Sequence, residues 1–147
     1  MELTKINHKT MNPLKLTAVA FIATFGLAAV AADDSAGTLP PASTKQGVTY
    51  AADIKPLLDT SCVTCHSGKK PKGRLKLDTL EDILKGGMDG KVVIVGASAD
   101  SLIVQAASHT AKDHDLWMPP KKAESKNPPL TSDQVGLLRA WIDQGAK

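Results

Sequence analysis

The chain has 147 residues, a length that suits one domain of ordinary size and leaves little room for a second. Hydrophobic residues make up 42% of it, a globular proportion that excludes a chain disordered throughout. The formal net charge of +3 includes three lysines and one glutamate from the first 32 residues, so the remainder carries only +1 and gives no support to nucleic-acid binding.

The first 32 residues have the pattern of a secretory signal peptide. Three lysines precede an apolar run from Leu16 to Ala32, and Ala29-Val30-Ala31 supplies the small residues of a cleavage site. The alternative is an uncleaved membrane anchor, but a run of seventeen residues, seven of them alanine, is shorter than the roughly 20 that span a bilayer. We therefore expect cleavage near Asp33, export to the periplasm, and no membrane span after cleavage.

Residues 33–48 follow the expected cleavage site. They are small and polar and include two prolines, a composition typical of a flexible leader. We expect order to begin near Thr49, so that one folded domain covers residues 49–147.

The rest of the chain indicates an all-α domain of about four short helices. Apolar spacing and end signals predict helices over residues 50–59, 78–84, 98–108 and 132–144. Pro56 makes the start of the first helix irregular. Asp78 with Glu81 is expected to cap the second helix, and Ser98 the third, whereas Thr131 and Gln134 form a capping box for the fourth. The β-branched run at 92–95 is too isolated to predict a sheet.

Two tryptophans remain outside the signal peptide. Trp141 is expected in the core, where it packs the last helix against the first near Tyr50. For Trp117, beside Met118, two interpretations stay open: its indole N–H bonds an acidic group, or the ring packs like an ordinary apolar side chain.

The stretch Cys62-Val63-Thr64-Cys65-His66 has the pattern of c-type haem attachment. Two thiols three positions apart on a helical turn reach the two vinyl groups at one edge of a porphyrin. The next residue, His66, is then carried beneath the ring to bind iron, and its other ring nitrogen is expected to donate to a backbone carbonyl. A buried porphyrin also supplies bulk to a chain with few aromatic residues. The sequence thus predicts haem c, with its iron, held by Cys62, Cys65 and His66.

Two other sites share the Cys-x-x-Cys spacing. A thioredoxin-like redox pair belongs with a βαβ pattern, which is missing here. Zinc is the stronger competitor, because Cys62, Cys65, His109 and His114 are ligand types at ligand spacing. However, 43 residues separate the two halves, and His66 would have no role.

The sixth iron ligand has several candidates, which are Met88, His109, His114 and Met118. Met118 precedes two prolines, which lack amide donors and stiffen the backbone, so little entropy is lost when a ligand docks. Met88 lies in a glycine-rich turn poorly suited to holding a ligand. Met118 is the predicted ligand, while a histidine ligand, an open site and a merely space-filling Met118 remain alternatives. The acidic group within reach of the neighbouring Trp117 indole would then be a haem propionate.

Several stretches in shared order carry a family resemblance: Ile54-Lys55-Pro56-Leu57-Leu58, Leu75-Lys76-Leu77-Asp78, Gly86-Gly87-Met88-Asp89-Gly90, Ser101-Leu102, Met118-Pro119-Pro120, Leu130-Thr131 and Trp141-Ile142-Asp143-Gln144-Gly145-Ala146. With the haem motif, residues 54–146 resemble the class I cytochrome c fold and, more narrowly, the planctomycete-type cytochrome c domain. The resemblance implies a small cytochrome c-like domain around one covalently bound haem. It also implies Met118 as distal ligand and a low-spin, six-coordinate iron that transfers electrons.

The predicted function is a mono-haem c-type cytochrome, a one-electron carrier in a periplasmic electron-transfer chain rather than an enzyme. The sequence shows no catalytic base, nucleophile or substrate pocket, so no catalytic residue is predicted. An electron-accepting subunit of a dehydrogenase complex is one alternative, and a haem sensor or peroxidase with an open iron position is another.

Basic residues follow both halves of the predicted haem site. They are Lys69, Lys70, Lys72, Arg74 and Lys76 after the haem motif, and Lys121, Lys122 and Lys126 after Met118. A cationic ring at an exposed haem edge would steer acidic redox partner proteins into contact. The alternative is an ordinary solvated surface.

Overall fold

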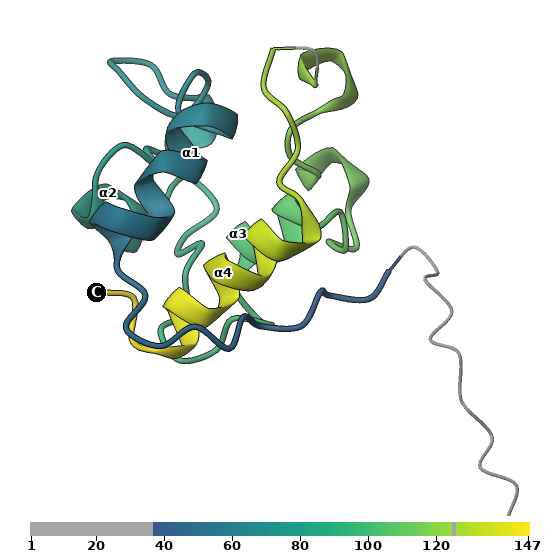
Figure 1. Cartoon of the computed structure of the whole chain (residues 1–147). Coiled ribbons are helices and arrows are strands. Elements are labelled where there is room, and N and C mark those ends of the chain that lie inside the picture. The colour runs from purple at the N-terminus through teal and green to yellow at the C-terminus, as the bar shows by residue number, and fades with distance from the viewer. Residues whose placement is uncertain (1–36, 125) are drawn as a thin grey trace, which may run out of the picture. The chain divides into compact units, whose positions relative to one another are not determined.

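A computed structural model describes residues 37–124 and 126–147 (Figure 1). The predicted signal peptide, residues 1–32, and the first residues of the predicted leader lie outside this range. Within the described residues, no helix has the length and apolar character needed to cross a membrane.

The chain enters the domain through a five-residue π-turn, Tyr50–Ile54, which continues into α1, Lys55–Ser61. Pro56 lies in the first turn of α1, directly after the π-helical residues, so the expected irregular start of this helix is confirmed. The amide of Cys62 donates to Leu58 O at 2.8 Å. The haem motif therefore continues directly from the last turn of α1.

The next two helices begin later than the sequence indicated. The second, α2, covers Leu80–Lys85 and is capped by Thr79, whose hydroxyl accepts from the amide of Asp82 at 3.1 Å. The predicted cap at Asp78 is wrong because Leu77 is buried and its amide donates to His66 O at 2.8 Å, which keeps the chain extended for one more residue.

The predicted cap of the third helix is also wrong. This helix, α3, covers Leu102–Ala107, and Ser101 is at its N-cap. Ser98 instead binds Asp143, to which its amide and its hydroxyl donate at 2.9 and 2.8 Å. The Asp143 carboxylate at the end of the last helix thus binds the serine that the local pattern predicted as the cap of α3.

The last helix, α4, covers Ser132–Asp143 and has the predicted capping box between Thr131 and Gln134. It contacts both α3 and the π-turn. Trp141 is fully buried, its ring centroid is 6.2 Å from that of Tyr50, and its indole donates to Lys147 O at 2.9 Å. The predicted core position of Trp141 is confirmed.

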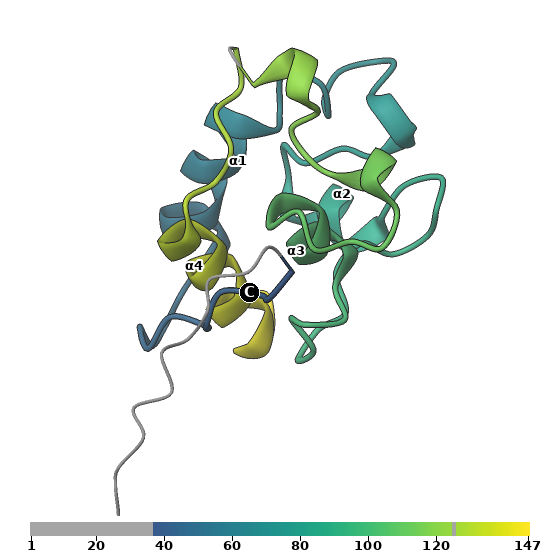
Figure 2. The same cartoon turned by 90° about the vertical axis from the view of Figure 1, so that its right-hand side faces the viewer.

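Two long loops complete the domain and contain three short 3₁₀ turns, Lys72–Arg74, His114–Leu116 and Lys121–Ala123. The loop after the haem motif and the loop after Met118 lie at the same end of the molecule in both views (Figures 1 and 2). No named strand occurs in the described part of the chain, so the domain is all-α, as predicted.

Part of the predicted leader packs along α4. The amide of Ser43 donates to Gly136 O at 2.9 Å, and the guanidinium of Arg139 donates to Pro40 O. Val48 is buried, and its amide donates to the side chain of Gln144 at 3.1 Å. Order therefore begins before Thr49, because α4 offers hydrogen-bonding partners that composition does not reveal.

Candidate functional site

An apolar cavity of about 260 Å³ lies between α1, α3, α4 and the two loops. Its lining comes from segments far apart in the sequence and is mostly aliphatic: Leu58, Leu75, Leu77, Val92, Leu102, Ile103, Ala106, Leu116 and Leu138 all contribute. Such a cavity suits a large flat apolar group better than a polar substrate.

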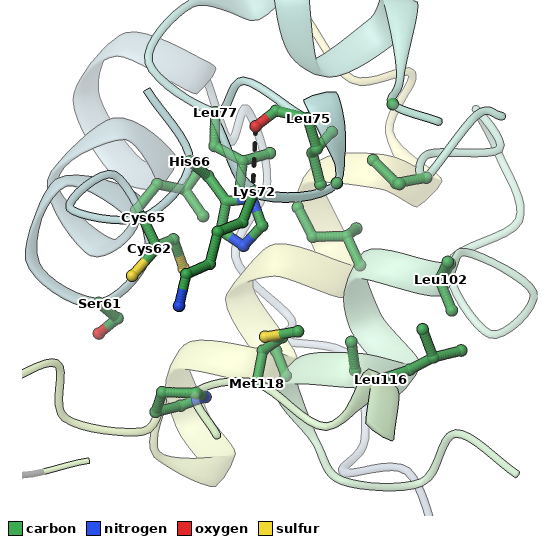
Figure 3. A pocket seen from close by; sticks show the side chains of 18 of the residues that line it. Ser61, Cys62, Cys65, His66, Lys72, Leu75, Leu77, Leu102, Leu116 and Met118 are labelled. Carbon is green, nitrogen blue, oxygen red and sulfur yellow. Dashed lines mark hydrogen bonds between the residues drawn. The ribbon is translucent and has the colours of Figure 1, made fainter. Parts of the chain in front are cut away.

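Both cysteines of the haem motif line this cavity and lie together at one side of it (Figure 3). Burial, followed by the neighbouring Cys65, raises the pKa of the Cys62 thiol to about 11. A reactive redox cysteine requires the opposite shift, because the thiolate is its nucleophile. The site therefore lacks the electrostatics of a thioredoxin-like pair.

His66 lines the same cavity and has a defined tautomer. Its Nδ1 lies 3.3 Å from Leu75 O, and because a carbonyl only accepts, Nδ1 carries the hydrogen. The expected bond to a backbone carbonyl is confirmed. Burial is the largest cause that lowers the pKa of His66, which favours the neutral ring. The lone pair of Nε2 is thus available for a metal ion.

Met118 lies across the cavity from His66, with its sulfur toward the interior (Figure 3). Its amide donates to Ala106 O in α3 at 3.0 Å. The other three candidates for a sixth ligand do not line the cavity. Met88 is 66% exposed, and both His109 and His114 lie against the ring of Trp117.

Trp117 does not line the cavity either, and its indole donates to Ala111 O at 2.9 Å. Of the two interpretations of Trp117, the structure favours packing over a bond to a propionate. The zinc alternative also fails, because no three His, Cys, Asp or Glu side chains gather as a metal site within the described ranges.

Sequence analysis missed Asn127, a polar residue of the lining. Asn127 is 5% exposed, and its Oδ1 has no hydrogen-bond partner among the described residues. It had no sequence signal beyond polarity in an irregular segment, which is also typical of an ordinary loop residue. Lys72, which the sequence placed in a possible cationic ring, is exposed and lines the cavity.

The donor set fits a haem. Two thiols lie at one edge of an apolar space, an imidazole with a free nitrogen lies on one face, and a thioether lies on the other. This combination matches haem c, which takes two thioether links on one side of the ring and can take one ligand on each face.

Comparison with known proteins agrees with this assignment. Residues 62–122 match a family model described as planctomycete cytochrome C, and the matched range begins at Cys62 and includes Met118. No curated protein and no solved structure matches the chain. The match supports a planctomycete-type cytochrome c domain, and such a domain implies covalently bound haem c and haem-based electron transfer.

Proposed function

We propose that the protein is a mono-haem, one-electron carrier in a periplasmic electron-transfer chain. The main support is that His66 and Met118 lie on opposite sides of one apolar cavity that has both cysteines at its edge. In this proposal Cys62 and Cys65 form the thioether links, His66 Nε2 is the proximal ligand and Met118 sulfur is the distal one. When bound, the haem supplies the Fe(III)/Fe(II) couple.

The chain's own residues tune that couple. The bond from His66 Nδ1 to Leu75 O fixes the ring orientation and makes Nε2 a better donor. A thioether at the distal position favours Fe(II) and raises the reduction potential. The aliphatic lining excludes water, which lowers the local dielectric around the charged metal. If His66 and Met118 both bind the iron, no coordination position would be open to a substrate, which favours a carrier over an enzyme.

The exposed basic residues support the proposal that the redox partner proteins are acidic. Lys72 lines the cavity, and the other exposed cations of the two loops are Lys69, Lys70, Arg74, Lys121, Lys122 and Lys126. Both loops lie at one end of the molecule (Figures 1 and 2). The ion pairs within the described residues, Lys45–Asp53 and Lys55–Asp59, involve none of these cations. Their charge is thus available to attract an acidic partner.

The proposed location depends on the N-terminal pattern. Residues 1–32 would direct export and be removed near Asp33. N-terminal sequencing of the protein from its native host tests this, and recovery of residues 16–32 in a membrane fraction would contradict it. Size exclusion of native extract separates a free carrier from an electron-accepting subunit of a dehydrogenase.

The decisive experiment concerns Met118. Oxidised wild-type protein should show the weak sulfur-to-iron absorption band near the red edge of the visible spectrum. Met118→Ala should abolish the band, lower the reduction potential and open the reduced iron to carbon monoxide, because the thioether is then lost. Met88→Ala is the matched control and should change none of these, since Met88 is exposed and outside the cavity.

Other outcomes would point elsewhere. If Met118→Ala keeps a low-spin iron with an unchanged potential, the distal ligand is another residue. If the wild-type protein already binds carbon monoxide without displacement of a ligand, the iron position is open. The carrier assignment would then give way to a sensor or peroxidase.

A further inference from the structure

Two hydrogen bonds hold the backbone of Met118. Its amide donates to Ala106 O at 3.0 Å, and its carbonyl lies 3.1 Å from Nε2 of His109. Because a carbonyl only accepts, Nε2 of His109 is the donor. The next two residues, Pro119 and Pro120, have no backbone N–H and cannot donate a hydrogen bond. The histidine bond is therefore half of the backbone anchoring at Met118.

The donor itself is held firmly. His109 follows α3 with a φ of +58°, a left-handed conformation in which His is one of the enriched non-glycine residues. Its amide donates to Ala106 O at 3.2 Å. Its ring stacks on Trp117 with centroids 5.2 Å apart and an interplanar angle of 2°. Trp117 is in turn anchored by its indole bond to Ala111 O.

We propose that His109 is a positioning residue for the distal ligand, which it restrains through the carbonyl of Met118. The inference rests on the proposed ligation by Met118. When the sulfur leaves the iron, the loop must move, and the bond from His109 has to break or stretch. Loss of that bond would make the ligand-free state about fivefold more populated, the usual effect of one net hydrogen bond.

The population of the ligand-free state can be measured with imidazole in solution, which binds ferric haem once the thioether has left. Its apparent affinity is proportional to the fraction of protein in that state. In the holoprotein, His109→Leu removes the donor, whereas His109→Gln keeps an N–H donor at a similar reach. His114→Leu is the matched control. This histidine contacts the same indole, at 4.1 Å between centroids, but makes no bond to Met118.

We expect His109→Leu to bind imidazole about fivefold more tightly and to lose the sulfur-to-iron band at a lower temperature than the wild type. His109→Gln and His114→Leu should stay within about twofold of the wild type. Melting followed by far-ultraviolet circular dichroism reports the global fold, which a merely structural role of His109 would alter without changing imidazole affinity.

An unchanged imidazole affinity in His109→Leu would overturn the inference. So would an equal gain in His114→Leu, which would assign the effect to packing on Trp117. A His109→Gln protein that folds but binds imidazole as tightly as His109→Leu would also overturn it. Failure of the ligation proposal looks different, because the wild type would then lack the sulfur-to-iron band, or Met118→Ala would retain it.

Discussion

Gly136 is the residue of α4 against which residues 40–43 pack. Replacing it with alanine should change stability in opposite directions in a chain that contains residues 40–43 and in one that lacks them. A Cβ at position 136 would lie 2.7 Å from Pro41 O, a backbone atom that cannot move without displacing its segment. Displacement would break the bond from Ser43 to Gly136 O and that from Arg139 to Pro40 O.

The magnitudes determine the sign. Alanine in place of glycine inside a helix stabilises by about 1 kcal/mol. The two hydrogen bonds contribute about 2 kcal/mol together, at about 1 kcal/mol each. Gly136→Ala should therefore destabilise the chain that contains residues 40–43 by about 1 kcal/mol. In a chain shortened to begin at Lys45, the clash is gone and the same substitution should stabilise by about 1 kcal/mol.

Thermal unfolding of the four haem-loaded proteins tests this, with shifts of about 4 °C expected in each direction. The opposite signs serve as an internal control, because helix propensity contributes equally to both pairs. If Gly136→Ala stabilises both chains equally, residues 40–43 do not dock on α4 and the predicted flexible leader extends up to Thr49.

Three further predictions concern the site and its surroundings. Acidified organic solvent should leave haem on the wild-type polypeptide and extract it from the double variant Cys62→Ala with Cys65→Ala, as absorbance of the two phases would show; haem that leaves the wild type would refute covalent attachment. Lys72→Glu should slow association with an acidic redox partner severalfold at low salt and weaken its salt dependence in stopped-flow measurements, whereas Lys147→Glu, at the chain terminus away from the two loops, should not. Burial raises the pKa of Tyr50 above its usual 10, so its contribution to stability is full below pH 10 and is lost as pH rises through the folded-state value. Tyr50→Phe should remove that alkaline loss from denaturant titrations at a series of pH values, and it should cost little at neutral pH because the buried hydroxyl has no partner among the described residues.

Local sequence determined those parts of the protein that need only neighbouring residues. The haem motif is one, because its spacing alone brings two thiols and an imidazole to one side of a helical turn. The capping box of Thr131 and Gln134 is another, since both bonds form within four residues. The inward position of Trp141 followed from helical periodicity.

Tertiary contacts decided the rest. Asp78 and Ser98 had good local cap patterns. However, the bond from the Leu77 amide to His66 O moved the cap of α2 to Thr79, and the side chain of Ser98 binds Asp143 instead of capping α3. The composition of the leader could not reveal that Pro41 lies close to Gly136, or that the side chain of Gln144 accepts a hydrogen bond from the amide of Val48.

The distal side of the site shows the same division. Sequence proposed four ligand candidates and favoured Met118 from its prolines, but only the folded chain shows which of them lines the cavity opposite His66. The bond from His109 to the carbonyl of Met118 had no sequence signal, because it joins residues nine apart across an irregular loop. Periodicity and motifs describe neighbours along the chain, whereas the cavity and its anchoring bonds depend on how the helices pack.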